Sequence, residues 1–474
     1  MSYQLWTHQR EAISRAKDLS SFALFFEVGT GKTATAIHTL REWISQGSKP
    51  LGAIVLCPPI VIRQWREEFA KYAEELLPWV VLLEGAGTKR LKTLKDSPRD
   101  RIFITNYETL LMAPVFAELT RKGLDVMVCD ESHKLKTFTA KRTRKAVDLA
   151  ARIPKKIIMT GTPVLNSPMD LFSQFLVLDN GATFGTNFFV FRATYFYDKN
   201  AGMPKQSYFP DWRPRPGIEE KIAALIAAKS MRVKKSECLD LPPLVKVELP
   251  VAMSPQQRRA YDEMKEDLVT YLDSNVCVAS MALTKLLRLQ QIVSGFVSVE
   301  SPDGEGGILH KFADVPRVAA LSELLEDIAP NHKVIVWACF KNNYEQIRGV
   351  CERLKLNYVE IHGERTEGQK REAVASFRSD DGVRVCIANQ KAGGVGLNLI
   401  EASYSIYFSR GYSLEDDIQS EARNYRGGSE RHDRVTRVDL VTRGSVDELI
   451  LAALKQKQRL SEKILDLRNE IASI

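Results

Sequence analysis

Residues 25–37, FFEVGTGKTATAI, combine the end of a buried strand, a loop with two glycines and the start of a helix. Gly29 and Gly31 let the loop backbone turn its N–H groups inward around phosphate oxygens, and the N-terminus of the following helix adds a partial positive charge. Lys32 would neutralise the β- and γ-phosphates, and the Thr33 hydroxyl would bind Mg²⁺. The stretch therefore predicts a nucleoside triphosphate site within an α/β domain.

This loop departs from the usual phosphate-binding spacing. The pattern G-x-x-x-x-G-K-[ST] needs glycine at position 26, where this chain has Phe26. A strand-to-helix turn that happens to contain GTGKT is the structural alternative. The strand before the loop and the helix after it are the context that the motif requires, so the nucleotide site is favoured.

Strands and helices alternate in two separate parts of the chain. Between residues 22 and about 178 the apolar runs are FALFFEV, GAIVLCP, RIFITNY, VMVCDE and KKIIMTG. Between about 316 and 460 they are KVIVWACF, NYVEIHG, VRVCIANQ, YSIYFSR and RVTRVDLV. Strands that are apolar on both faces and separated by helices indicate a parallel sheet covered on both sides. We expect an α/β fold with two lobes, each a mostly parallel sheet covered by helices.

We predict three parts along the chain. Residues 1–178 form an N-terminal ATP-binding lobe, 179–315 a helical insertion and linker, and 316–474 a C-terminal lobe with a terminal brace helix. The insertion opens with the aromatic-rich stretch 184–198 and passes through the proline-rich YFPDWRPRPG. Its aromatic residues could stack on bases, but packing in a small helical subdomain is their more common role.

Composition and charge place the chain among ordinary globular proteins. Of its 474 residues, 44% are apolar and 27% charged, and no run approaches the roughly 18 to 20 apolar residues of a membrane helix. The N-terminus lacks an apolar signal stretch, so we expect a cytoplasmic protein, and its compactness suggests a prokaryotic or viral source. The seven cysteines form no C-x-x-C pair, so neither a disulfide framework nor a zinc site is expected. The formal charge of +8 is compatible with a nucleic-acid partner, but an ordinary solvated surface is the favoured explanation when the charge is taken alone.

An acidic pair follows one of the predicted strands. VMVCDESHKLK places Asp130 and Glu131 at the carboxyl end of a strand, the edge at which open parallel sheets bind ligands. Asp130 would hold Mg²⁺, and Glu131 would orient or deprotonate the attacking water. A solvated acidic pair is the alternative, which the phosphate loop on the same sheet disfavours. Short hydroxyl side chains at 160–162, in MTGTPVLNSP, could sense the γ-phosphate or simply form a polar turn.

Two arginines stand in a helix predicted over residues 413–428. Gln419, Arg423 and Arg426 form a stripe beside the apolar stripe of this helix. Arginines held on one helix face suit the charge that builds on a transferred γ-phosphate. We expect ATP to lie between the lobes, so that hydrolysis is coupled to their opening and closing. A solvated helix face is the alternative reading.

A glycine-rich segment at 390–402 follows the strand VRVCIANQ. Gly393, Gly394 and Gly396 permit a close approach of the backbone to a nucleic-acid phosphate or to the other lobe. A tight structural bend is the competing interpretation.

Taken in order, these motifs resemble those of the superfamily two helicase-type ATPases, and specifically of the Swi/Snf-like DNA translocases. The matching segments are EVGTGKT, CPPIVIRQW, ITNYETL, DESHKLK, MTGTPVLNSPMDLFSQF, AGGVGLNL and QSEARNYRGG. They cover nearly the whole chain. The stretch after GTP, the AGG-x-GLNL segment and DESH in place of DEAD favour this family over DEAD-box RNA helicases.

The resemblance implies two RecA-like lobes, ATP with Mg²⁺, and a set of site residues. Gln9 would contact adenine, Asp130 and Glu131 the metal and the water, and Arg423 and Arg426 the transition state. The implied nucleotide-binding residues are Gln9, Gly29, Thr30, Gly31, Lys32 and Thr33, with Thr33 and Asp130 at the metal. Segments around Pro58, Thr105 and Gly394 would touch the nucleic-acid backbone.

The chain departs from this family around the last arginine. The family usually has histidine before it and Ile-Gly-Gln after it, whereas this chain has Tyr425, Gly427 and Gly428. This departure leaves open in detail how hydrolysis is coupled to the movement of the lobes, but both arginines are present.

We therefore expect an ATP hydrolase that moves along double-stranded DNA and remodels or displaces a DNA-bound protein, with no membrane partner. A strand-separating DNA or RNA helicase is the nearest alternative, because a separating pin could lie within 179–315. A nucleic-acid clamp that holds ATP without turnover is another. The presence of Glu131, Arg423 and Arg426 argues against the clamp.

Overall fold

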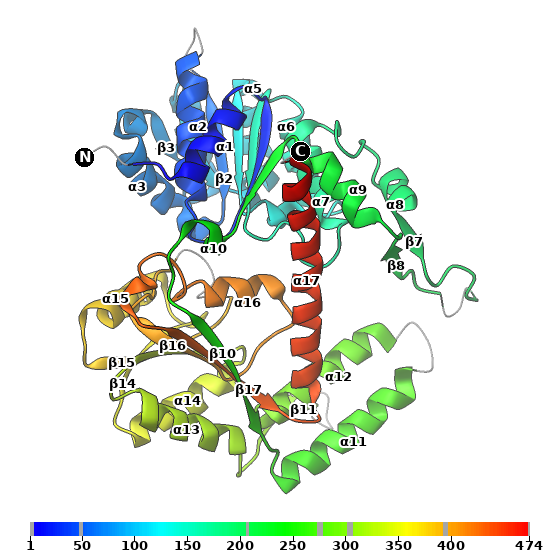
Figure 1. Cartoon of the computed structure of the whole chain (residues 1–474), viewed down its shortest axis with the longest axis vertical. Helices are drawn as coiled ribbons and strands as arrows, with labels where there is room; N and C mark the ends of the chain where they lie inside the picture. The colour runs from blue at the N-terminus through cyan, green and yellow to red at the C-terminus, as the bar shows by residue number, and fades with distance from the viewer. Residues whose placement is uncertain are drawn as a thin grey trace. The chain divides into compact units, whose positions relative to one another are not determined.

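The computed structural model describes residues 4–46, 51–204, 208–272, 278–300, 307–391 and 397–472. The chain divides into two compact units (Figure 1). Unit 1 comprises residues up to 197, 213–240 and those from 457 onward, and unit 2 comprises 198–212 and 241–456.

Unit 1 contains a seven-stranded sheet in the order β3-β4-β2-β5-β6-β1-β9, and its strands pair in parallel. The strands are β1 (Ser21–Phe26), β2 (Ala53–Cys57), β3 (Val80–Leu82), β4 (Ile102–Asn106), β5 (Val126–Asp130), β6 (Lys155–Met159) and β9 (Ser230–Val233). All six residues of β1 are buried, as expected of a central strand that is covered on both faces.

Helices cover both faces of this sheet. The helices of unit 1 are α1 (Thr7–Lys17), α2 (Lys32–Gln46), α3 (Ile62–Tyr72), α4 (Gly87–Asp96), α5 (Ala113–Lys122), α6 (Lys141–Ala150), α7 (Asp170–Asp179), α8 (Phe188–Tyr195), α9 (Ile218–Ala227) and α10 (Lys235–Cys238). Phe22, Leu24 and Phe26 of β1 share a core with α1, α2 and α3. Phe25 points to the other face and meets Phe175 of α7, with 6.3 Å between ring centroids. The alternation of side chains along β1 thus separates two helical layers.

Unit 2 contains a six-stranded sheet in the order β10-β17-β16-β13-β15-β14, again with parallel pairing. The strands are β10 (Leu244–Val251), β13 (Lys333–Trp337), β14 (Asn357–Ile361), β15 (Val383–Ala388), β16 (Ala402–Tyr407) and β17 (Val435–Thr442). Val334 and Val336 face one core, and Ile335 and Trp337 face the other. This sheet is therefore also buried on both faces, as the sequence predicts.

The remaining elements of unit 2 are helices and a hairpin. The helices are α11 (Pro255–Leu272), α12 (Val278–Val293), α13 (Pro316–Ile328), α14 (Lys341–Arg353), α15 (Glu367–Ser379) and α16 (Leu414–Glu421), and β11 (Phe296–Glu300) pairs with β12 (Gly307–Lys311). The last helix, α17 (Val446–Ala472), begins in unit 2, and its residues from 457 are counted with unit 1. Among the described residues, no helix is both long and apolar enough to cross a bilayer.

The predicted fold class is confirmed, and all the strands expected from apolar runs are present. The segment 179–315 differs from the expected helical insertion. It contains α8, α9, α11 and α12, but it also supplies β9 to the sheet of unit 1 and β10 to the sheet of unit 2. Both are edge strands: β9 is only four residues long, and most of β10 is exposed, so neither shows the buried apolar run that marks the other strands. The three-part division itself stays a prediction.

The aromatic stretch 184–198 is packed mainly in a core. Phe184, Phe191 and Phe196 are buried, and Phe191 lies 5.0 Å from Phe172 of α7 between ring centroids. Phe189 and Tyr197 are exceptions and are exposed. Core packing, the favoured explanation, therefore accounts for most of these rings.

Candidate active site

The loop between β1 and α2 has the backbone conformation that its glycines suggest. Gly29 and Gly31 have φ angles of 93° and 84°, in the left-handed region that favours glycine. The Lys32 ammonium donates to the carbonyl oxygens of Phe26 at 2.9 Å and Glu27 at 3.3 Å. The loop therefore wraps around the cationic end of Lys32, the first residue of α2. Thr33 follows it and is half-buried.

The start of α1 packs against this loop. Gln9 is fully buried, and its Nε2 donates to the carbonyl of Gly31 at 3.2 Å while its Oε1 accepts from the backbone N–H of Trp6 at 2.8 Å. The His8 Nε2 lies 2.9 Å from the carbonyl oxygen of Thr30. A Cβ atom at Gly31 would lie 2.2 Å from the Gln9 Nε2. The predicted nucleotide-binding residues Gln9, Gly29, Thr30, Gly31 and Lys32 are thus brought together in unit 1.

A hollow of about 760 Å³ lies beside the start of α1. Residues 4–8 line one part of it, and Glu237 and Cys238 of α10 line another. Its volume falls in the range of small-molecule sites, roughly 300 to 1,000 Å³. The Glu27 Oε2 accepts from the backbone N–H of Lys235 at 3.0 Å, which ties α10 to the phosphate loop.

Asp130 ends β5 as a buried carboxylate, 8% exposed. Its Oδ2 accepts from the Trp65 indole Nε1 and its Oδ1 from the backbone N–H of Glu131, both at 2.9 Å. Burial raises the pKa of Asp130 to about 7, and the adjacent charge of Glu131 acts in the same direction. The hydrogen bond from Trp65 and the charge of Lys32 oppose this shift, so Lys32 and Asp130 belong to one electrostatic site.

Glu131 adopts an unusual backbone conformation. Its φ of 51° places a non-glycine residue in the left-handed region, where L-residues are strained. The Glu131 Oε2 accepts from the Thr160 Oγ1 at 3.2 Å. The His133 Nδ1 lies 3.3 Å from that carboxylate oxygen and 2.9 Å from the Thr160 Oγ1. The structure therefore brings the hydroxyl segment after β6 into contact with the acidic pair.

A buried amide joins these two segments, and the sequence analysis missed it. Gln174 of α7 donates through Nε2 to the carbonyls of Pro163 and Asp170, both at 2.8 Å, and accepts through Oε1 from the Ser132 Oγ at 2.8 Å. Three of its hydrogen-bonding positions are used inside the protein. The signal in the sequence was a glutamine within the apolar helix DLFSQFLVLD, where every residue before the last is buried.

The helix predicted over 413–428 is shorter in the structure. The prediction that Gln419, Arg423 and Arg426 form a stripe on one helix face is therefore wrong. In the structure α16 ends at Glu421, and both arginines lie in the turn that follows. The physical reason is Asn424, which is buried: its Oδ1 accepts from the Ser405 Oγ at 2.9 Å and its Nδ2 donates to the Ala402 carbonyl at 3.1 Å. A short polar side chain that bonds backbone elsewhere favours a turn over a continued helix.

Arg423 and Arg426 are held in this turn, and both belong to unit 2. Arg423 is buried and donates through Nη1 to the Leu397 carbonyl at 3.0 Å, while Arg426 is half-buried. The phosphate loop, Asp130 and Glu131 belong to unit 1. Gly393, Gly394 and Gly396 lie outside the described residues.

The predicted nucleic-acid contacts stay predictions. Thr105 is fully buried, and its hydroxyl donates to the Leu83 carbonyl at 3.1 Å and lies 2.7 Å from the Thr109 Oγ1. The Thr105 side chain therefore stabilises the end of β4 from inside the protein. If this segment contacts nucleic acid, residues adjacent to Thr105 would make the contact. Pro58 is also buried, just before the turn that leads to α3.

Two family comparisons cover most of the chain. The SNF2-related domain matches residues 8–295, and the helicase conserved C-terminal domain matches residues 316–428. A solved structure, the Sulfolobus solfataricus SWI2/SNF2 ATPase core in complex with dsDNA, is similar with a TM-score of 0.45 and 21% identity, over 98% of this chain and 93% of that one.

Curated relatives match at about one quarter identity. The DNA repair and recombination protein RDH54 of Saccharomyces cerevisiae is 25% identical over 501 residues, 96% of this chain and 53% of that protein. The uncharacterized ATP-dependent helicase MG018 of Mycoplasma genitalium is 25% identical over 97% of this chain and 42% of that protein. The human TATA-binding protein-associated factor 172 is 22% identical over 94% of this chain and 27% of that protein.

The chain spans about half the length, or less, of these curated relatives. Their sources are yeast, a bacterium and human, so they do not support the prediction of a prokaryotic or viral source. Because the SNF2-related domain matches more than half of the residues, and the helicase C-terminal domain follows it in the expected order, the chain belongs to the SNF2 family of helicase-like ATPases.

Proposed function

We propose that this chain is an ATP-dependent motor that tracks along double-stranded DNA and remodels or displaces protein that is bound there. The observation that carries the proposal is the electrostatic site of unit 1. A phosphate loop around Lys32, a buried Asp130 and a strained Glu131 meet at the carboxyl edge of one parallel sheet.

The residues at this edge fit a magnesium nucleotide. Thr33 and Asp130 offer hydroxyl and carboxylate oxygens, the donors that Mg²⁺ prefers. The phosphates of the nucleotide would complete the coordination, because Mg²⁺ is usually bound through one or two carboxylates together with substrate phosphates. Mg²⁺ would neutralise charge on the β- and γ-phosphates. The raised pKa of Asp130 supports this assignment, because a cation there would offset the repulsion from Glu131.

Glu131 is our candidate for the group that orients or deprotonates the attacking water. Thr160 and His133 hold its carboxylate from one side, which restricts where the second oxygen can point. The same contacts would let the segment after β6 respond to the γ-phosphate.

We further propose that Arg423 and Arg426 complete the site from unit 2. An arginine that meets the transferred phosphoryl group typically raises turnover by roughly 10³ to 10⁵. Hydrolysis would then require the two units to close on one ATP, and product release would let them open. Such a cycle converts hydrolysis into relative motion, which a translocase needs.

Double-stranded DNA is the proposed track. RDH54 is named a DNA repair and recombination protein, and the similar solved ATPase core is in complex with dsDNA. The formal charge of +8 fits contacts to backbone phosphates. Binding should therefore weaken steeply with salt and show little sequence preference.

A strand-separating helicase is the second candidate, and one feature favours it. Residues 196–214 contain a small sheet of β7 (Phe196–Asp198) and β8 (Trp212–Pro214). Phe209, between these strands, is 60% exposed. An exposed aromatic residue between paired strands could act as a wedge against a base pair.

Steady-state ATP hydrolysis tests the proposal. We would compare the purified chain without nucleic acid and with single-stranded DNA, double-stranded DNA or double-stranded RNA, with Glu131→Gln as the inactive control. We expect strong stimulation by duplex DNA alone, and no release of a labelled strand from that duplex. Strand release, or stimulation mainly by single strands or RNA, would favour the helicase. Equal turnover in all four conditions would contradict a nucleic-acid track.

A further inference from the structure

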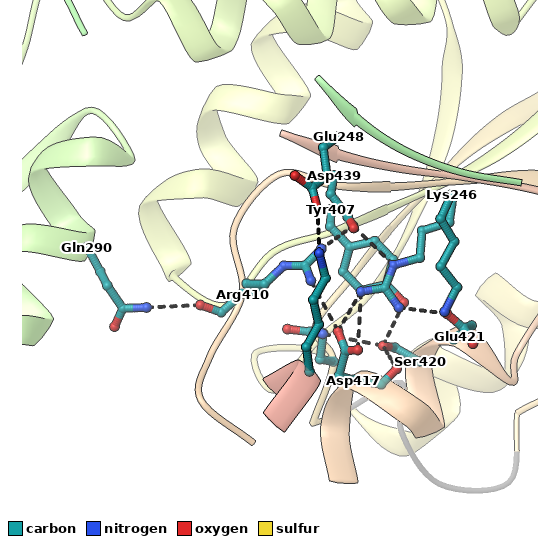
Figure 2. A network of polar contacts seen from close by, with 12 residues as sticks. Lys246, Glu248, Gln290, Tyr407, Arg410, Asp417, Ser420, Glu421 and Asp439 are labelled. Carbon is teal, nitrogen blue, oxygen red and sulfur yellow. Dashed lines mark hydrogen bonds and ion pairs between the residues drawn. The ribbon is translucent and has the colours of Figure 1, made fainter. Parts of the chain in front are cut away.

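A cluster of charged side chains surrounds α16 in unit 2, and Figure 2 shows most of it. We call it the α16 charge cluster; it comprises Lys246, Arg410, Asp417, Glu421, Arg437 and Asp439. Asp417 and Glu421 stand one helical turn apart on α16, and the other members come from β10, β17 and the segment before α16. The cluster therefore joins one short helix to the edge of the sheet.

Arg437 of β17 is the centre of this cluster. Its Nη2 lies 2.9 and 3.2 Å from the two carboxylate oxygens of Asp417, and its Nη1 lies 2.7 Å from the Glu421 Oε2. Its Nε donates to Asp439 at 3.1 Å. The guanidinium also stands 4.1 Å from the ring centroid of Tyr407. One planar guanidinium thus binds the carboxylates of both Asp417 and Glu421, a role that suits arginine and not lysine.

The cluster is balanced in charge, and all its members except the exposed Lys246 are largely withdrawn from water. It holds three cations and three carboxylates, and the Arg437 side chain is only 6% exposed. Burial raises the pKa of Glu421, but the charges of Arg437 and Lys246 outweigh it and hold that pKa below its ordinary value. Buried charges are costly unless each one is paired, so removal of one member leaves its partners unsatisfied.

Further contacts run from the cluster toward the arginine turn. The Ser420 Oγ lies 2.9 Å from the Tyr407 hydroxyl, and the Ser420 carbonyl accepts from the backbone N–H of Arg423 at 3.1 Å. The Glu421 carbonyl accepts from the backbone N–H of Tyr425 at 3.2 Å. The last residues of α16 are therefore bonded to the cluster through their side chains and to the turn through their backbone.

We propose that Arg437 is a positioning residue for Arg423 and Arg426: it fixes α16 against β17, and α16 in turn fixes the turn that carries the two arginines. This inference rests on the proposed function, in which those arginines meet the γ-phosphate. A rigid support matters there, because a displacement of about 1 Å at a reacting centre can lower turnover by roughly 100-fold.

Unit 2 contains a matched control for this inference. Arg317 of α13 is 2% exposed and donates to the Phe408 carbonyl at 2.7 Å, to the Thr442 Oγ1 at 2.8 Å and to Asp447. It is as buried as Arg437 and is bonded through both of its terminal nitrogens, although its Nε has no hydrogen-bond partner among the described residues, and it braces the start of α17. Arg437→Lys and Arg317→Lys make the same chemical change at two comparable sites.

The experiment measures kcat and KM for ATP at saturating duplex DNA, together with Tm, for both lysine variants of the full chain. We expect similar losses of Tm, but a fall in kcat of about 10- to 100-fold for Arg437→Lys alone, with KM changed by less than about twofold. In an Arg423→Ala/Arg426→Ala background, Arg437→Lys should cause no further fall, because it acts through those two arginines.

The results distinguish a failure of the proposed role of Arg423 and Arg426 from a failure of the positioning role of Arg437 alone. If Arg423→Ala/Arg426→Ala leaves kcat unchanged, the proposed role of the arginines is wrong, and the inference fails with it. If that double variant lowers kcat but Arg437→Lys behaves like Arg317→Lys, or multiplies the loss of the double variant, only the positioning role is overturned. Should Arg437→Lys fail to fold, Glu421→Gln is the substitute, and it should lower kcat while sparing KM.

Discussion

The acidic edge of unit 1 and the α16 charge cluster of unit 2 are both buried groups of charges beside parallel sheets, but their balance differs. Asp130 and Glu131 are adjacent carboxylates, and burial with mutual repulsion raises the pKa of Asp130 to about 7. In the α16 charge cluster each carboxylate meets at least one cation, and the pKa of Glu421 is lowered.

This contrast separates two uses of buried charge. A site with an excess of one sign gains stability when a ligand of the other sign arrives, whereas a balanced network is already satisfied and resists displacement. Under the proposed function, unit 1 would accept a cation with its nucleotide, and unit 2 would hold the arginines in place.

The largest effect is expected at the unbalanced site. Glu131→Gln removes the carboxylate proposed to activate water, so we expect kcat to fall by at least about 10³-fold. Nucleotide binding should persist, since the phosphate loop is untouched. ATPase assays together with binding of a fluorescent ATP analogue check both parts. Turnover within tenfold of the parent chain would mean that another group is the base.

Gly31→Ala tests whether the loop and Gln9 form one site. The new Cβ would lie 2.2 Å from the Gln9 Nε2 on a backbone with φ of 84°, so both the loop and Gln9 must shift. We expect KM for ATP to rise by about 10-fold or more.

Gly123→Ala is the matched control, because Gly123 also has positive φ (60°), but the Cβ of an alanine there would meet no neighbouring atom within 4 Å. It should cost about 1 kcal/mol of stability and leave KM unchanged. Equal changes of KM in the two variants would argue against a site that includes Gln9.

The unbalanced carboxylates also predict a dependence of stability on pH. The folded pKa of Asp130, about 7, lies above its ordinary value of 3.8, so the folded state keeps a proton that the unfolded chain has lost. Stability without nucleotide should therefore fall as pH rises from about 4 to about 7 and level off above that.

Calorimetry of the parent chain and Asp130→Asn at several pH values would measure this effect. Asparagine cannot ionise, so the Tm of Asp130→Asn relative to the parent should rise by about 4 °C or more between pH 5 and pH 8. Added Mg²⁺ and ATP should remove the difference, because the cation stabilises the ionised form. A difference in Tm that stays constant with pH would show that Asp130 is not the titrating group.

The smallest effect is expected at Gln174, the buried amide that joins two segments of unit 1. Gln174→Leu keeps the volume but leaves the Ser132 hydroxyl and the Pro163 carbonyl without this partner, which should cost about 1 to 2 kcal/mol of stability. Ser173→Ala is the control, since the buried Ser173 hydroxyl has no hydrogen-bond partner among the described residues. Denaturant titration compares them, and equal stability of the two variants would show that the Gln174 bonds contribute little.

The sequence predicted those parts of the molecule that depend on short-range patterns. Apolar runs marked the central strands, and GTGKT and the acidic pair marked the edge at which Lys32 and Asp130 share one electrostatic site. Edge strands β9 and β10 were missed, because an edge strand need not be apolar on both faces.

Features that depend on distant partners could not be predicted. The end of α16 at Glu421 is set by Asn424, whose partners Ala402 and Ser405 lie on β16. Likewise, nothing in the stretch RVTRVDLV distinguishes Arg437 from an ordinary charged residue. Its role depends on contacts with Asp417 and Glu421 that only the fold creates. Periodicity carries no information about such pairs.

The indole of Trp65 makes the protein its own optical probe. Its N–H is bonded to the Asp130 carboxylate at 2.9 Å, and the ring is buried in α3. Any event that changes the charge on that carboxylate changes the electric field across the indole, and with it the wavelength of its fluorescence. Six tryptophans contribute to the total emission, so a difference spectrum against Trp65→Phe would isolate this signal. The arrival of a cation at Asp130 could thus be followed in real time without a label.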